Sequence, residues 1–235
     1  KGAERHKELH EEISEVIEVE TSSREEFWGL YVFNILGCLS QIQDQKICRE
    51  IPLFGQIEGV WVMGTADQIK CNAQGQFILS DHKTRKRNSM PSIEQKRTTR
   101  LQLMLYKTLY DQLRTGESLF FTELGLDLQA QFQGELLSLL QEHQLPFRTF
   151  DELFQYMMTS FAQAPPLSNR MKIVYEWQQN NDFIGMDSFD FDKKTMLAQV
   201  QNGLQYWKGK RKAQVVPFQQ RWKCRYCNFQ QKCSF

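Results

Sequence analysis

The stretch from Gly64 to Arg87, GTADQIKCNAQGQFILSDHKTRKR, predicts a β-hairpin around which the rest of the chain is organised. We expect its turn at residues 72–76, where Gly75 can adopt the positive φ that a tight turn requires. A three-residue loop centred on residue 74 pairs strand residues whose numbers sum to 148, which places Asp67 directly opposite Asp81. A β-bulge at Gly75 would shift this register.

The predicted register gathers charged side chains on one face of the hairpin. Side chains alternate along a strand, so Lys83 shares the face of Asp81 and of its partner Asp67. Two close carboxylates repel each other unless a cation lies between them, and carboxylate oxygens suit Mg²⁺ or Mn²⁺. Such an ion lowers the pKa of a bound water and shields an attacked phosphate, and a lysine can stabilise the developing charge. The alternative is a surface hairpin with ordinary solvated charges.

Charge is distributed unevenly along the chain, although the formal net charge of its 235 residues is only +1. Residues 1–30 hold nine acidic and four basic side chains, whereas residues 193–235 hold ten Lys or Arg and no Asp or Glu. Residues 81–100 hold seven bases and two acids. The basic residues at 81–100 form a cationic rim beside the paired carboxylates, which favours phosphate binding. For the basic residues at 193–235, a solvated helix face is the alternative interpretation. No apolar run reaches the length of a membrane span.

Hydrophobic periodicity predicts helices over residues 2–19, 24–43, 127–143, 150–161 and 192–207. A further helix is expected from Pro91, as its first helical position, to about Leu113, with a capping box from Ser92 and Gln95 and a stop at residues 115–116. Its core stripe is expected at Leu101, Leu105, Leu109 and Leu113. Outside the hairpin, strands are expected over 47–54, 57–70, 117–123 and 171–177, with a turn at Gly55.

Three of the six cysteines crowd the end of the chain, in the pattern Cys224-x2-Cys227-x5-Cys233. This spacing does not resemble a secreted disulfide framework and indicates metal or cluster ligation. Zinc is the default for such a two-plus-one set, whereas cysteine-only ligation also suits an iron–sulfur cluster. A fourth thiolate could come from Cys38, Cys48 or Cys71, although Cys38 is expected in the core and Cys71 on a hairpin strand.

Several short motifs occur in the order seen in RecB-type PD-(D/E)xK nucleases. They are Gly2-x-x-x-His6, Gly64-x-x-Asp67, Asp81-x-Lys83-Thr84, Gln102-x-x-x-Tyr106 and the cysteine-containing tail. Ala66 stands where the family has the proline that gives the motif its name. Further stretches make the chain most similar to the eukaryotic exonuclease V family, over nearly its whole length: Arg49-Glu-Ile-Pro-Leu-Phe-Gly55, Lys83-Thr-Arg-Lys-Arg87 and Tyr206-Trp207.

This resemblance implies an α/β fold of the restriction-endonuclease-like PD-(D/E)xK type, in which helices flank a central mixed sheet. Residues 1–207 would form the nuclease domain, with a helical insertion near 117–170, and residues 208–235 an iron–sulfur segment. The implied activity is metal-dependent exonucleolytic cleavage of single-stranded DNA in repair. The implied location is the nucleus, with the mitochondrion as the alternative. The implied protein is a monomer that binds single-stranded DNA and a single-strand-binding protein, but no membrane. The alternatives are a non-catalytic single-strand-binding module of nuclease fold and a zinc-stapled RNA-binding protein.

The resemblance also implies a role for individual side chains. It makes His6, Asp67, Asp81 and the main-chain carbonyl of His82 ligands of Mg²⁺ or Mn²⁺, and Lys83 the catalytic lysine. Gln102 and Tyr106 would support the site and contact the strand. His10 lies one helical turn from His6 and is the alternative ligand.

The same resemblance assigns Cys224, Cys227 and Cys233 to a [4Fe–4S] cluster, with a fourth cysteine expected upstream of residue 1. The basic rim is expected to bind DNA phosphates through Arg85, Arg87 and Arg100. Aromatic side chains could stack on bases independently of sequence, with core packing as the alternative for each: Trp61, Tyr106, Tyr110, Tyr206 and Trp207.

Overall fold

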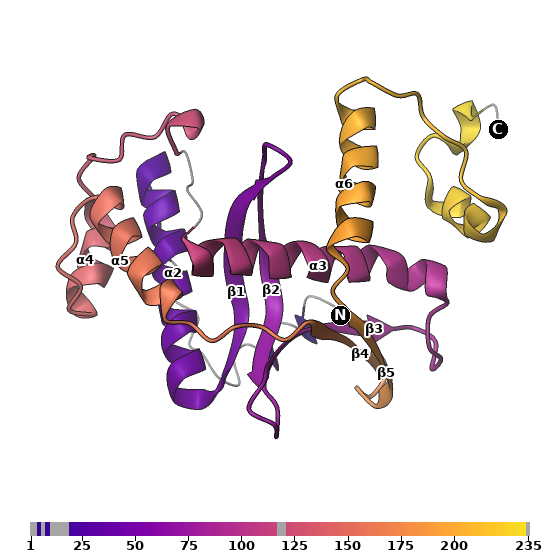
Figure 1. Ribbon diagram of the computed structural model, residues 1–235, viewed down its shortest axis with the longest axis horizontal. Helices are drawn as coiled ribbons and strands as arrows, with labels where there is room; N and C mark the ends of the chain where they lie inside the picture. The colour runs from indigo at the N-terminus through magenta and orange to yellow at the C-terminus, as the bar shows by residue number, and fades with distance from the viewer. Residues whose placement is uncertain (1–3, 6–7, 10–18, 117–120, 234–235) are drawn as a thin grey trace.

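The computed structural model describes residues 4–5, 8–9, 19–116 and 121–233, and these form an α/β fold built on a mixed five-stranded sheet (Figure 1). The strands follow one another across the sheet in chain order, and only β3 and β4 run parallel. The strands are β1 (Ile47–Ile57), β2 (Val60–Cys71), β3 (Phe77–Arg85), β4 (Arg170–Trp177) and β5 (Phe183–Asp190). The parallel step requires a crossover, and the connection from β3 to β4 carries three of the helices.

The helices pack around this sheet and close one hydrophobic core. They are α2 (Arg24–Gln45), α3 (Ile93–Thr115), α4 (Gly134–Glu142), α5 (Phe150–Ala162) and α6 (Lys193–Trp207). Short 3-10 helices lie at η1 (Phe121–Leu124), η2 (Phe218–Tyr226) and η3 (Gln230–Lys232). In Figure 1, α3 crosses the strands of the sheet and the C-terminal tail stands away from it. Helix α2, strand β1 and helix α3 contribute fully buried side chains to the core, including Ile35, Leu53 and Leu109.

The predicted hairpin and its register are confirmed. Gly75 has a φ of +75°, and the Asn72 side chain accepts hydrogen bonds from the main-chain N–H groups of Gln74 and Gln76. Cys71 lies opposite Phe77 and Gln68 opposite Ser80, so the paired numbers sum to 148 without a bulge. The ladder ends at this last pair, one position before the two aspartates.

The predicted turn at Gly55 is wrong, because β1 continues through it to Ile57. The chain turns instead at Glu58 and Gly59, which have φ values of +53° and +67°. A Cβ at Gly55 would lie 2.5 Å from Oε1 of Gln112, so this glycine lets α3 approach the strand.

The limits of helix α3 are close to those predicted. Ser92 is its N-cap and forms the capping box with Gln95, so Pro91 precedes the cap and is not the first helical residue. Gly116 ends the helix with a φ of +70°. The predicted stripe is only partly right: Leu109 and Leu113 are buried, but Leu101 and Leu105 are half-buried, and Leu103 and Met104 are buried in their place.

Three further elements differ from the prediction. Strand β5 was not expected, because its only buried side chain is that of Asp187, so its sequence lacks the apolar alternation of a half-buried strand. Residues 121–123 belong to a 3-10 helix and not to a strand, while residues 117–120 fall outside the described residues. The helix expected over 127–143 is confined to α4.

The helix expected over residues 2–19 falls mostly outside the described ranges, in which residues 4–5 and 8–9 are helical. No helix in the described part of the chain combines the length and the hydropathy that a membrane span needs.

Candidate active site

The sheet register shows which faces carry the predicted catalytic residues. Asp187 of β5 lies opposite Ile173 of β4, and Ile173 lies beside Asp81 of β3. Directly neighbouring residues on adjacent strands share a face, and Arg100 of α3 binds Asp187. Asp81 therefore lies on the face that α3 covers, and by alternation His82 lies on the opposite face.

Asp81 is an incompletely satisfied buried carboxylate. Its side chain is only 1% exposed, and its Oδ1 accepts a hydrogen bond of 2.8 Å from Nζ of Lys83. Its Oδ2 is buried and has no hydrogen-bond partner among the residues that the structure describes. Burial and the nearby charge of Asp67 raise the pKa of Asp81 to about 7. A buried oxygen without a donor suits a bound cation.

Asp67 lies beside Asp81 where β2 and β3 separate. Its Oδ2 accepts a hydrogen bond of 2.9 Å from the main-chain N–H of His82, immediately beyond the last pair of the ladder. The side chain thus continues the contact between the strands after the main chains part. Sequence reasoning and structure agree that Asp67, Asp81 and Lys83 gather at one place.

Lys83 is a cation at this site. Burial lowers its pKa, but the charges of Asp81 and Asp67 and the hydrogen bond to Asp81 outweigh burial, so its pKa is raised above the ordinary value. Its side chain remains 35% exposed. A lysine that keeps its proton can donate hydrogen bonds but cannot bind a metal or accept a proton.

Gln102 and Tyr106 of α3 complete this side of the site. Nε2 of Gln102 donates a hydrogen bond of 2.9 Å to the Tyr106 hydroxyl. The ring of Tyr106 lies over Gly64, where a Cβ would be 2.8 Å from a ring carbon. Tyr106 is also among the groups that raise the Lys83 pKa. The glycine of the Gly64-x-x-Asp67 motif therefore lets the helix lie close to the strand that carries Asp67.

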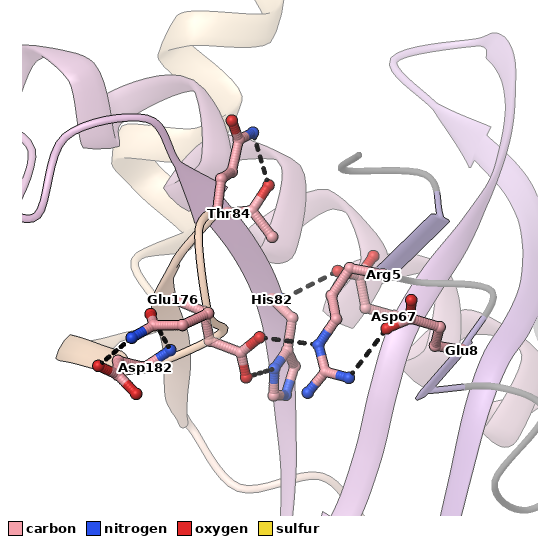
Figure 2. A network of polar contacts seen from close by, with 9 residues as sticks. Arg5, Glu8, Asp67, His82, Thr84, Glu176 and Asp182 are labelled. Carbon is pink, nitrogen blue, oxygen red and sulfur yellow. Dashed lines mark hydrogen bonds and ion pairs between the residues drawn. The ribbon is translucent and has the colours of Figure 1, made fainter.

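A second group of charges lies on the other face of β3 (Figure 2). Nε of Arg5 donates a hydrogen bond of 3.0 Å to Oε2 of Glu176, and Nδ1 of His82 lies 3.9 Å from Oε1 of the same carboxylate. Sequence reasoning did not select Arg5 or Glu176. The signal was weak: Glu176 is the one acidic residue of strand β4, but the strand also carries Arg170 and Lys172.

The residues proposed to bind DNA lie in different environments. Arg100 is bound to Asp187 through Nε and Nη2, both at 2.7 Å, so its guanidinium group already has a carboxylate partner. Arg85 follows Lys83 on the α3 side of β3, and its Nε is buried without a hydrogen-bond partner among the described residues. Arg87 lies beyond the end of β3 and is exposed.

The aromatic residues proposed to stack on bases also separate into two groups. Tyr110 is fully buried and donates a hydrogen bond to the Pro165 carbonyl, so it belongs to the core. Nε1 of Trp61 donates a hydrogen bond to Glu123. Tyr206 and Trp207 are 46% and 83% exposed at the end of α6, where they remain available for stacking.

The proposed ligands of the metal and of the cluster are only partly described. His6 and its alternative His10 lie outside the described residues, and within those ranges no three His, Cys, Asp or Glu side chains form a metal-binding group. Cys38 and Cys48 are buried in the core and Cys71 belongs to β2. The remaining cysteines lie in a tail that has no buried residue from 208 to 233: Cys224, Cys227 and Cys233.

Comparison with known proteins identifies the family. A family model described as exonuclease V, a 5' deoxyribonuclease, matches residues 1–76, 71–163 and 137–235. Exonuclease V of Danio rerio is 32% identical over 242 residues, which cover 100% of this chain and 60% of that protein. The chain therefore spans about three fifths of that relative's length. The crystal structure of SSO0001 covers 99% of this chain and 96% of its own, but 15% identity and a TM-score of 0.40 are too low to support a conclusion. Because the family model matches the chain from end to end, the chain belongs to the exonuclease V family.

Proposed function

We propose that this protein is a metal-dependent nuclease that hydrolyses phosphodiester bonds of single-stranded DNA in repair, on a PD-(D/E)xK core. The observation that supports this most directly is the buried Oδ2 of Asp81, which has no donor in the described structure and lies beside Asp67 and Lys83. Membership of a family described as 5' deoxyribonucleases supports the same reaction class.

The proposed metal ligands are Asp67, Asp81, His6 and the carbonyl of His82. The donor set is made of hard oxygens and one imidazole, which suits Mg²⁺ or Mn²⁺. When bound, such an ion lowers the pKa of water and shields phosphate charge. The orphaned Asp81 oxygen fits this role, since without a cation it would remain a desolvated acceptor.

Lys83, Gln102 and Tyr106 have separate roles in the proposed reaction. Lys83 presents a protonated ammonium group beside Asp81 and stabilises the negative charge that develops on the phosphate. Gln102 orients the Tyr106 hydroxyl through its hydrogen bond. The ring of Tyr106, held against Gly64, fixes the strand that carries Asp67. Hydrolysis by water at such a site needs no covalent enzyme intermediate.

Single-stranded DNA is the proposed substrate because of basic side chains at the end of β3 and aromatic side chains at the end of α6. Arg85 and Arg87 extend from the end of β3 that carries Lys83, and cations in this position neutralise phosphates. Tyr206 and Trp207 are exposed, and the guanidinium of Arg211 lies 5.2 Å from the centroid of the Tyr206 ring. Exposed aromatic rings bind unstacked bases with little sequence preference.

We also propose that Cys224, Cys227 and Cys233 bind an iron–sulfur cluster with a fourth ligand from outside this trio. The tail that carries them buries no side chain and exposes Phe218, Tyr226 and Phe229. A small segment without a core usually needs a metal or another staple to fix its fold. Anaerobic purification should give absorbance near 400 nm and bound iron, both reduced by Cys227→Ser. Stoichiometric zinc without iron would overturn this assignment.

The nuclease proposal can be tested with end-labelled single-stranded and double-stranded DNA, with and without Mg²⁺. We expect Mg²⁺-dependent release of label from the single strand, which Asp81→Asn abolishes while DNA binding persists. Asp190→Asn, a change of the same kind at an exposed carboxylate of β5, is the matched control. DNA binding without Mg²⁺-dependent cleavage would favour the non-catalytic binding module.

A further inference from the structure

Glu176 occupies an unusual place for a carboxylate. Strand β4 lies between β3 and β5, and Glu176 lies opposite Thr84, on the face of the sheet that carries His82. Its side chain is only 13% exposed. A carboxylate at such a depth must be paired, because an unpaired buried charge is costly.

The partner of Glu176 comes from the other end of the chain. Arg5 precedes it by 171 residues, is 20% exposed, and donates the 3.0 Å hydrogen bond from Nε to Oε2. Arg5 has a second, outer partner in Glu8, at 3.3 Å from Nη1, but that carboxylate is 59% exposed. Leu9 is also buried. The ion pair with Glu176 (Figure 2) and the burial of Leu9 therefore hold the described N-terminal residues in place.

This ion pair lies next to the proposed metal ligands at two points. In sequence, Arg5 directly precedes His6. In space, Glu176 lies 3.9 Å from the ring of His82, whose main-chain N–H binds Asp67. Glu176 and Asp67 thus lie beside the same residue of β3: Glu176 is 3.9 Å from its ring, and Asp67 accepts the hydrogen bond of its main-chain N–H.

We propose that Glu176 is a positioning residue for the metal centre: it anchors Arg5, and the next residue in the sequence, His6, is a proposed metal ligand. This inference rests on the proposed function. In this proposal Glu176 acts through Arg5 and does not itself bind the metal. Groups that orient metal ligands in this way typically change metal affinity by 10- to 100-fold when they are removed.

The test measures metal binding and N-terminal docking separately in the full chain. Mn²⁺ affinity is measured by titration calorimetry, and docking by hydrogen exchange of a peptide that covers residues 4–9. Glu176→Gln should weaken Mn²⁺ binding about 10- to 100-fold and accelerate exchange of the peptide. Arg5→Gln should do the same, because it removes the other half of the ion pair.

A matched control and a rescue separate positioning from general damage. Glu8→Gln removes only the exposed partner of Arg5 and should leave both quantities within about twofold. The exchange of charges in Arg5→Glu with Glu176→Arg should recover part of the Mn²⁺ affinity that Glu176→Gln loses. Saturating Mn²⁺ should restore kcat in Glu176→Gln more than it restores kcat in Asp81→Asn.

The possible failures are distinguishable. Unchanged Mn²⁺ affinity in Glu176→Gln, with or without faster exchange, would overturn the positioning role, and so would a charge exchange that binds Mn²⁺ no better than the single variant. If Asp81→Asn binds Mn²⁺ as the unaltered protein does, the proposed metal site itself fails, whatever the exchange data show.

Discussion

Two buried aspartates on the same face of the sheet have opposite electrostatic environments. Asp187 accepts hydrogen bonds from Nζ of Lys96 at 3.2 Å and from two nitrogens of Arg100 at 2.7 Å each, and these bonds hold its pKa below the ordinary value. Asp81 accepts one bond, from Lys83, and burial raises its pKa to about 7. Asp187 is satisfied by the fold, whereas Asp81 still has an oxygen without a donor.

Helix α3 produces this difference. Its first turns present Lys96 and Arg100 to Asp187, and its middle presents Gln102 and Tyr106 to the region of Lys83. A fold that only minimised its free energy would supply donors to both carboxylates, because an unsatisfied buried acceptor costs about 1–3 kcal/mol. An unsatisfied, strongly perturbed carboxylate is more often found where a protein binds or reacts.

The largest expected effect is a loss of catalysis when Lys83, the hydrogen-bond partner of Asp81, is removed. Lys83→Ala should lower the single-turnover cleavage rate about 10²- to 10³-fold, because one preorganised donor to the transition state is lost. Mn²⁺ affinity should change little, since a protonated lysine is not a ligand. Lys70→Ala, on an exposed position of β2, is the control, and a rate within about threefold of the parent would make Lys83 merely structural.

The next largest effect is a loss of stability when Asp187, the carboxylate with several hydrogen-bond donors, is changed. Asp187→Asn should lower the free energy of unfolding by about 2 kcal/mol, because Lys96 and Arg100 would lose their partner while both remain partly buried. Urea denaturation measures this quantity. Asp190→Asn, at a pair in which both side chains are at least 52% exposed, should change it by less than about 0.5 kcal/mol. Equal effects of the two substitutions would show that the Asp187 ion pairs contribute no more to stability than an exposed pair.

The raised pKa of Asp81 predicts that the stability of the metal-free protein falls as the pH rises. Asp81 has a folded pKa of about 7 and an ordinary value of 3.8, so between these values the folded state keeps a proton that the unfolded state releases. Ionisation of Asp81 therefore costs stability, and the metal-free protein should become less stable as pH rises from 4 to 7. Asp81→Asn should lose this component. Parallel stability curves for the two proteins would show that Asp81 does not titrate abnormally.

The smallest effect is on DNA binding and compares two arginines. Arg85→Ala should reduce the slope of log affinity against log salt by about 0.7, the value for one phosphate contact to a single strand. Arg100→Ala should change the slope less, since the guanidinium of Arg100 is already bound to Asp187. A titration of fluorescent oligonucleotide binding against NaCl gives both slopes. An unchanged slope in Arg85→Ala would place this residue away from the path of the DNA.

The sequence by itself determined the centre of the molecule. The period of two along a strand and the turn at Gly75 place Asp67, Asp81 and Lys83 together, and these rules act between residues close in the chain. The capping box at Ser92 and the glycine at 116 likewise marked the ends of α3, because caps depend on the residues within one helical turn.

Tertiary structure alone decided what surrounds that centre. The crossover between β3 and β4 brings Glu176 beside the residues after Asp81 and lets it bind Arg5, a partner 171 positions away. Packing of α3 against β5 gives Arg100 the carboxylate of Asp187, although the sequence placed Arg100 in the basic rim. No local pattern contains such pairs, since they depend on how the whole chain closes around its core and buries charges that must then find partners.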